Sequence, residues 1–182
     1  MTETAGGSAK PPHPTSLPLA ADVTAREAAE TLARAAADAM WSTDHASQAL
    51  GMEILDVGPG HARIRMQIRP DMTNGHGMCH GGYIFLLADS TFAFACNSHN
   101  QKTVAAGAEI HFLAPAQRGD VLTAEGREQH RAGRSGVYDV RVTDQTGRTV
   151  ALFRGKSAAI EGAVIPGTQP PARPRSRRPP AD

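Results

Sequence analysis

Few features of secreted, membrane or nucleic-acid-binding proteins occur in this chain of 182 residues. Only two cysteines are present, Cys79 and Cys96, and they cannot form the disulfide framework of a small secreted domain. No basic segment followed by an apolar one stands near the N-terminus, and the longest apolar run, residues 83–95, contains Asp89 and is too short to span a bilayer. We therefore expect a reduced, cytoplasmic location and no membrane partner.

The chain also has no large excess of positive or of negative charge. The net charge is +1, and residues 24–165 carry 14 Lys and Arg against 15 Asp and Glu. A nucleic-acid-binding domain concentrates basic residues, so no nucleic-acid partner is expected. Aromatic residues make up 4% of the chain and apolar residues 40%, which predicts a core built mainly from small aliphatic side chains.

The two ends of the chain differ in composition from its middle. Residues 1–22 and 166–182 are rich in Pro and small polar residues, and they have too little apolar surface to offset the entropy lost on ordering. We expect both segments to be disordered. A single domain of residues 23–165, with an N-terminal helical extension, remains between them.

Helical patterns occur in three places. Thr24 and Glu27 have the spacing of a capping box, and apolar residues then recur on one face, which predicts a helix over residues 25–40. A second, short helix is expected to end before Gly51. Residues 81–97 are apolar on most sides, which predicts a buried helix rather than one docked by a single face.

The remaining segments have the period of strands. In residues 62–68, Ala, Ile and Met alternate with Arg and Gln, which is typical of a half-buried strand. Further strands are predicted over residues 103–114, 120–130, 136–144 and 148–160, and short turns containing Gly join them. The pattern predicts an α+β fold in which an antiparallel sheet wraps round the buried helix.

The segment from Asn74 to Asp89 is the most informative for chemistry. A Gly-rich loop leads into the predicted helix start, where free backbone N–H groups and the helix dipole favour developing negative charge. A dinucleotide fingerprint beginning at Gly75 would need Gly where His80 stands, and the Gly-Lys-Ser/Thr of a P-loop is absent. An oxyanion site is therefore favoured over a nucleotide phosphate site.

Three side chains of this loop have competing interpretations. His76, Cys79 and His80 could ligate a metal, but no further ligand cluster follows, and haem attachment would need a second Cys. We expect no metal and no cofactor. Cys79 could instead be a thiolate nucleophile or a small buried side chain, and His80 could simply bond the backbone at the helix start.

Asp89 is an isolated carboxylate in an apolar helix, where an unpaired charge is costly unless it has a partner or a task. It could alternatively cap a helix after a break. Gly81 precedes it by eight residues, which is about 12 Å of rise along a continuous helix, so the two cannot act on one carbon within one chain. If both act on one substrate, two antiparallel copies of the helix must meet in a dimer.

Eight short motifs can be compared with known families. They are Asn74-Gly-His, His80-Gly81-Gly82, Phe85-x-Leu87-Ala88-Asp89, Asn97-Ser98, Phe112-Leu113-x-Pro115, Gly119-Asp120, Gly136-Val137-Tyr138-Asp139 and Ala151-Leu152-Phe153-Arg154-Gly155-Lys156-Ser157. Together they resemble the hotdog-fold acyl-CoA thioesterases of the phenylacetate-degradation (PaaI) type, over residues 44–161. The resemblance implies a curved antiparallel sheet wrapped round a long central helix, assembly as a homodimer at least and usually as a homotetramer, and metal-free hydrolysis of aryl- or (hydroxy)phenylacetyl-CoA thioesters.

The resemblance also implies roles for individual residues. Asp89 corresponds to the catalytic carboxylate, either a general base or a nucleophile, and Gly81 to the helix-start residue whose N–H polarises the thioester carbonyl. Asn74 and His80 correspond to loop residues that orient the thioester or the attacking water. The same fold also serves acyl-CoA hydratases or dehydratases and non-catalytic acyl-CoA-binding proteins, which stay open as alternatives.

The phosphates of CoA would need basic partners. Basic residues on or near predicted strand ends are candidates for this role, although each could equally be a solvated surface side chain. These candidates are Arg131, Arg134, Arg154 and Lys156.

Overall fold

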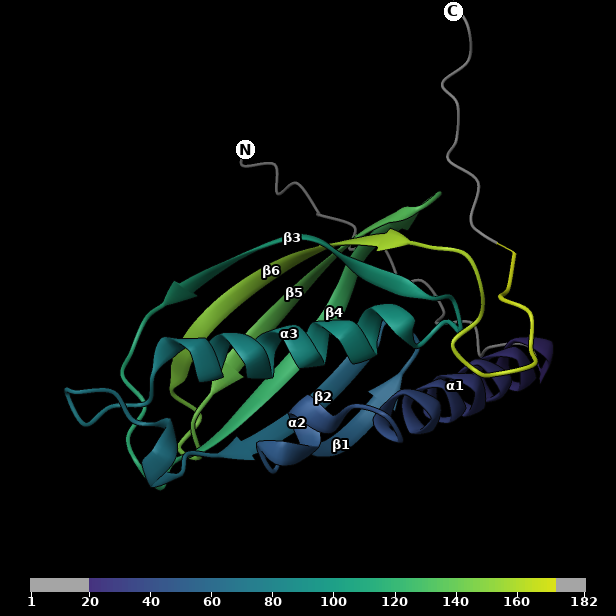
Figure 1. Ribbon diagram of the computed structural model, residues 1–182. Coiled ribbons are helices and arrows are strands. Elements are labelled where there is room, and N and C mark those ends of the chain that lie inside the picture. The colour runs from purple at the N-terminus through teal and green to yellow at the C-terminus, as the bar shows by residue number, and fades with distance from the viewer. Residues whose placement is uncertain (1–19, 173–182) are drawn as a thin grey trace, which may run out of the picture.

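A six-stranded antiparallel sheet curves round one long helix (Figure 1). The computed structural model describes residues 20–172. Its elements are α1 (Ala20–Trp41), α2 (His45–Ala49), β1 (Glu53–Gly58), β2 (His61–Gln67), a short 3-10 helix (Pro70–Met72), α3 (Gly81–Asn97), β3 (Thr103–Phe112), β4 (Val121–Ala132), β5 (Ser135–Thr143) and β6 (Thr149–Ala159). The strand order is β1-β2-β4-β5-β6-β3, and every neighbouring pair is antiparallel. The predicted α+β fold, with a curved sheet round a central helix, is confirmed.

The strand and helix bounds agree closely with the sequence pattern except at the start of α1, which begins at Ala20 and not at residue 25, so Thr24 lies inside the helix and the capping-box prediction is wrong. The sequence pattern also misses β1 and the short 3-10 helix. β1 was not predicted, because a bulge between Ile54 and Asp56 interrupts the alternation that would have identified it. The predicted disorder of residues 1–19 and 173–182 concerns segments outside the described residues. Ala20 to Asp22 belong to α1, and the chain beyond Ile165 is held by Asn100, whose Nδ2 donates to Thr168 Oγ1 at 2.9 Å.

The core lies between α3 and the concave face of the sheet. The Phe92 ring contacts the rings of Tyr138 and Phe153, with centroids 5.5 and 5.9 Å apart. Glycine in β6 permits this approach, because a Cβ on Gly155 would lie 2.8 Å from Phe92 Cδ2. The close contact fixes the height of α3 above the sheet and therefore the position of the site that α3 carries.

α3 is buried on most sides, as its sequence predicts, but one side is half-exposed. Leu87, Ala88 and Phe92 are buried against the sheet, whereas Leu86 and Asp89, one turn apart, are only partly covered. Asp89 therefore lies on a side of the helix that residues 20–172 cover only in part. None of the helices among residues 20–172 is long and apolar enough to cross a membrane.

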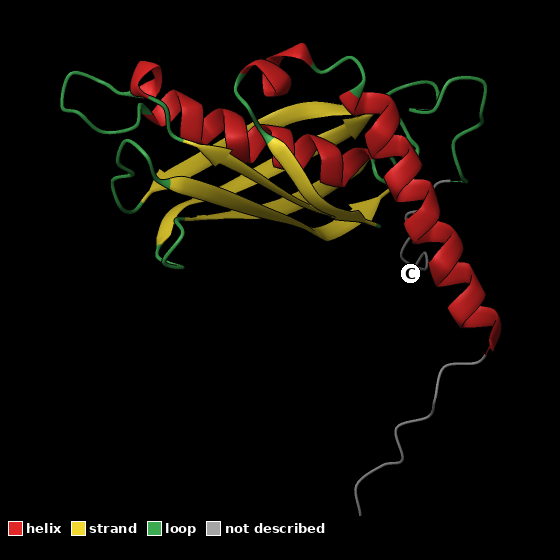
Figure 2. Cartoon of the chain, turned by 90° about the horizontal axis from the view of Figure 1, so that it is seen from below, coloured by secondary structure: helices red, strands yellow, loops and turns green. Residues whose placement is uncertain are grey.

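β3 differs from the half-buried strand that its alternation predicts. Val104 and Phe112 are 46% and 53% exposed, and Ile110 is the most covered of the alternating apolar residues. The reason is its position: β3 pairs with β6 on one side and forms an edge of the sheet on the other. At the opposite edge, α1 lies beside β1 and extends past the sheet (Figure 2).

Candidate active site

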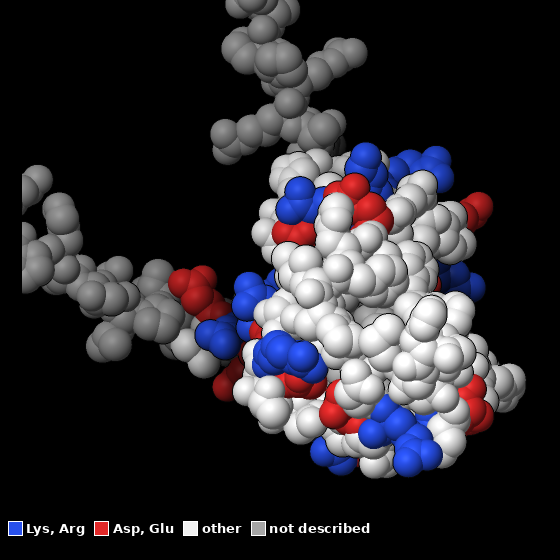
Figure 3. Space-filling model, turned by 90° about the vertical axis from the view of Figure 1, so that its left-hand side faces the viewer, with Lys and Arg blue, Asp and Glu red and all other residues white. Residues whose placement is uncertain are grey.

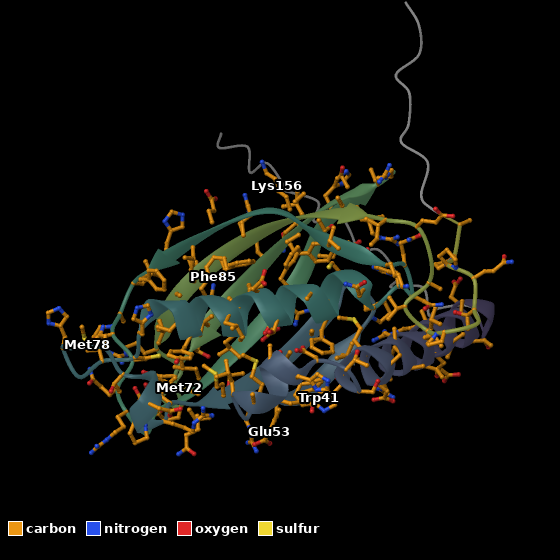
Figure 4. All side chains as sticks on the ribbon, in the orientation of Figure 1. Trp41, Glu53, Met72, Met78, Phe85 and Lys156 are labelled. Carbon is orange, nitrogen blue, oxygen red and sulfur yellow. The ribbon has the colours of Figure 1, made fainter. Side chains whose placement is uncertain are left out.

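The loop before α3 is organised by Asn74. Its Oδ1 accepts hydrogen bonds from the backbone N–H groups of His76 at 2.9 Å and Met78 at 3.3 Å, and its own N–H donates to the Met78 carbonyl at 2.8 Å. Met78 lies in this loop, at the left of Figure 4. The Cys79 N–H donates to the Ala116 carbonyl at 2.8 Å, which ties the loop to the segment after β3. Asn74 therefore shapes the approach to α3, with its amide nitrogen still available to donate.

The first turn of α3 leaves one amide without an acceptor. His80 is the N-cap residue, and its Nδ1 accepts from the Gly82 N–H at 3.0 Å, while the Tyr83 N–H donates to the His80 carbonyl at 3.0 Å. Within residues 20–172 the Gly81 N–H has no hydrogen-bond acceptor. Because His80 Nδ1 is an acceptor here, a neutral imidazole carries its proton on the exposed Nε2. The Gly81 amide is thus the donor that the helix start offers to an oxyanion.

Asp89 stands two turns along the same continuous helix. Its carboxylate has no hydrogen bond or ion pair among the described residues, and burial raises its pKa above the usual value of 3.8. α3 is continuous from Gly81 to Asn97, so the eight positions from Gly81 to Asp89 correspond to about 12 Å along the helix axis. A single chain therefore does not bring these two groups together.

An apolar hollow borders the Gly81 amide, and no sequence pattern predicts it. Its volume is about 440 Å³. Figure 3 looks onto this end of the molecule and shows uncharged side chains across its centre and charged ones around them. The lining residues are Met78, Cys79, Gly81, Ile84, Phe112, Leu113, Ala114, Pro115 and Ala116. The sequence identifies Phe112 only as part of a motif, because its contact with Gly81 joins segments far apart in the chain.

The four basic candidates lie on two faces of the sheet and away from the Gly81 amide. Arg131 forms an ion pair with Glu128 at 3.4 Å and Arg134 Nε donates to the Ala159 carbonyl at 3.0 Å, both near the far end of α3. The Arg154 guanidinium donates two hydrogen bonds to the Asp139 carboxylate, at 2.6 and 2.7 Å. Lys156, two residues further along β6, is exposed on the side of the sheet opposite Phe85 (Figure 4).

The alternative chemistry of the loop finds little support. Burial raises the pKa of the Cys79 thiol to about 11, which keeps it protonated near neutral pH and disfavours a thiolate nucleophile. Among residues 20–172 no three His, Cys, Asp or Glu side chains converge on a position that could hold a metal ion. Cys79 is a small buried side chain, and His80 caps the helix as one of its two interpretations predicts.

Comparison with known proteins identifies the family. Residues 76–151 match the model of the thioesterase superfamily. Acyl-coenzyme A thioesterase PaaI of Escherichia coli K12 is 44% identical over 128 residues, which are 70% of this chain and 91% of that protein. The solved structure of the E. coli PaaI protein, from the phenylacetic acid degradation operon, has a TM-score of 0.73 at 43% identity and covers 74% of this chain and 97% of its own.

A more distant relative was solved with its ligand. A hypothetical thioesterase protein of Streptococcus pneumoniae TIGR4, solved with coenzyme A, has a TM-score of 0.59 at 28% identity and covers 61% of this chain and 87% of its own. The fold, the motifs and these comparisons agree. The chain belongs to the hotdog-fold acyl-CoA thioesterases of the PaaI type, and it is a thioester hydrolase.

Proposed function

We propose that the protein hydrolyses aryl- or (hydroxy)phenylacetyl-CoA thioesters to the free acid and CoA. The observation that carries the proposal is the Gly81 N–H at the start of α3, which has no acceptor within residues 20–172 and belongs to a residue that lines an apolar hollow. A thioester carbonyl at this N–H would place its acyl group against apolar side chains. The relative named for acyl-CoA thioesterase activity, from a phenylacetic acid degradation operon, supports the choice of an aromatic acyl group.

The reaction requires stabilisation of an oxyanion and removal of a proton. When water adds to the carbonyl carbon, negative charge moves to the oxygen, and one well-placed donor such as the Gly81 N–H contributes about 2.7 to 4 kcal/mol to the transition state. Asp89 takes the proton of the water, or attacks the carbonyl itself to form an anhydride that water then cleaves. The C–S bond breaks and CoA leaves as a thiolate. Asn74 Nδ2 and His80 Nε2 are proposed to orient the thioester or the water.

The proposed site is composite, because Gly81 and Asp89 cannot reach one carbon within a chain. Two copies of α3 that run antiparallel in a homodimer would place Gly81 of one subunit beside Asp89 of the other. The half-exposed side of α3 and the open apolar edge at β3 support such an interface, since a monomer would leave both uncovered. We extend the proposal to a homotetramer, as a pair of such dimers.

We propose Lys156 and Arg134 as the first contacts for the CoA phosphates because both side chains are exposed. Arg131 and Arg154 would contribute further positive charge from their ion pairs.

A cytoplasmic location is supported by the two buried cysteines, which are free thiols.

The test is thiol release from a panel of CoA thioesters. Phenylacetyl-CoA, hydroxyphenylacetyl-CoA and benzoyl-CoA are expected to release CoA faster than hexanoyl-CoA does. Formation of an enoyl or hydroxyacyl product from a linear substrate, without free CoA, would instead indicate a hydratase or dehydratase. Tight binding without turnover on any substrate would indicate a binding protein.

The acid limb of the pH profile should lie above that of an ordinary Asp. Burial raises the pKa of the Asp89 carboxyl, because loss of water disfavours its charged form. The mechanism needs the carboxylate, so kcat/KM should fall as the pH drops through this raised pKa. The measurement is kcat/KM for phenylacetyl-CoA against pH. Activity that persists undiminished down to the usual Asp range near 3.8 would contradict Asp89 as the active base.

A further inference from the structure

Phe112 lies close to Gly81, the residue that carries the proposed oxyanion donor. It is the last residue of β3, and the end of its ring points at the first residue of α3. A Cβ built on Gly81 would lie 3.0 Å from Phe112 Cζ, 3.3 Å from Cε1 and 3.5 Å from Cε2. Outside the helix and the neighbouring residues, the tip of the ring is thus the nearest group to a side chain at position 81, which would press on it.

The ring is also a wall of the apolar hollow. Phe112 is 53% exposed even though it touches Gly81, and the adjoining Leu113 is 57% exposed. Gly81 and Phe112 both line the hollow, so a carbonyl bound at the Gly81 N–H would have its acyl substituent within reach of the ring. Aromatic pairs gain beyond plain apolar contact when an edge meets a face, and this favours an aryl over a linear acyl group.

We propose that Phe112 is a specificity-determining residue that selects aromatic acyl groups at the Gly81 amide. The inference rests on the proposed thioesterase function and names the side chain that sets its substrate class. Phe112 itself takes no part in bond making or breaking. It shapes one side of the acyl site and holds an apolar surface next to the oxyanion donor.

The experiment compares two substrates in three variants. Phe112→Ala removes the ring, Phe112→Leu keeps most of the apolar volume without the aromatic edge, and Leu152→Ala is the control. Leu152 is a similarly exposed apolar residue, 40% exposed, on the neighbouring strand β6, and it is paired with His111 rather than facing the hollow. The readout is the ratio of kcat/KM for phenylacetyl-CoA to that for hexanoyl-CoA, with the assembly state of each variant measured by sedimentation.

The expected result is a change in preference rather than a general loss. Both Phe112 variants should lower the ratio, by about tenfold in Phe112→Ala, while Leu152→Ala keeps the wild-type ratio. Equal losses on both substrates, or an unchanged ratio in a variant that assembles as the wild type does, would overturn the role of Phe112. A wild-type protein that cleaves no CoA thioester would overturn the proposed function itself, so the two failures are distinguishable.

A second variant pair tests the contact directly. Gly81→Ala retains the backbone N–H but sets a methyl group against the Phe112 ring, so it should also lower the aromatic preference. In the Phe112→Ala background the same change meets no ring, and its effect on the ratio should disappear. Effects that simply add in the double variant would show that the ring does not transmit the change, and would contradict the proposal.

Discussion

Replacing Asp89 with Asn is expected to lower kcat/KM for phenylacetyl-CoA by about 10²- to 10⁴-fold, the range for loss of a general base, and by more if Asp89 is the nucleophile. Asn has the same shape but can neither accept a proton from water nor attack the carbonyl effectively. The carboxylate has no partner within residues 20–172, so the change breaks no ion pair that the chain itself makes. Turnover within about threefold of wild type would contradict the assigned role.

The same substitution should leave the fold at least as stable at neutral pH. The pKa of Asp89 is raised by burial, so the folded protein holds this proton more tightly than the unfolded chain does. The free energy of unfolding of the wild type therefore falls as the pH rises from the pKa of Asp89 in the unfolded chain through its pKa in the folded protein. The Asp89→Asn variant has no titrating group at this position and does not lose this stability. Thermal melts of both proteins over this pH range should show the difference growing with pH. A variant that is clearly less stable at neutral pH would indicate that Asp89 has a structural partner.

Replacing Gly155 with Ala is expected to destabilise the fold by about 1 to 3 kcal/mol, the usual cost of overpacking a core. The new Cβ would lie 2.8 to 2.9 Å from three atoms of the Phe92 ring, which is itself confined by Tyr138 and Phe153. The ring and α3 must shift to make room. The effect should therefore reach Asp89, which lies one turn before Phe92 on the same helix, and lower activity as well as stability.

A matched control is available at another strand glycine. Gly58, at the end of β1, has no heavy atom within 4 Å of the position of an added Cβ, so Gly58→Ala should change the free energy of unfolding little. The measurement is urea unfolding of both variants, with the slope checked for constancy. Equal stability of the two variants would show that the packing of Phe92 on Gly155 leaves room for a methyl group.

The sequence predicts most of the fold because its periods are clear. Residues 62–68 alternate strictly and form β2, and the apolar residues 81–97 form the buried helix α3. The sequence does not predict β1, because the bulge in this strand interrupts the two-residue alternation of apolar and polar side chains. The sequence also does not predict the exposure of β3. Alternation shows that a strand has an apolar side, but it does not show whether the same chain covers that side.

Without the family resemblance, the chemistry of the site is predictable only where it depends on local spacing. The spacing of eight positions from Gly81 to Asp89 predicts their separation once the helix is continuous, and the structure confirms that it is. Spacing alone does not identify which first-turn amide stays free, because this depends on the side-chain cap that His80 provides to Gly82, and only the family resemblance points to Gly81. The ion pair of Arg154 with Asp139 depends on the register of β5 and β6, so the sequence alone could not separate paired from unpaired basic residues.

The composite site can be tested by mixing two inactive variants. Asp89→Asn lacks the carboxylate, and Gly81→Pro lacks the N–H while remaining tolerable in the first turn of a helix after the extended His80. A Cβ at position 81 presses on Phe112 in both Gly81→Pro and Gly81→Ala. Gly81→Ala is therefore the control, because it makes the same contact with Phe112 but keeps the backbone N–H. Before mixing, circular dichroism should show that each variant is folded, and sedimentation should show that it assembles as the wild type does.

After subunit exchange, a mixed dimer contains one site with both lesions and one site with neither. Random exchange of equal amounts should therefore restore about a quarter of the wild-type thioesterase activity per subunit, because half of the dimers are mixed and each has one intact site. If each site were built within one chain, every site of the mixed dimer would carry one lesion. Activity that stays at the level of the separate variants after demonstrated exchange, or a fully active wild-type monomer, would contradict a site shared between two subunits.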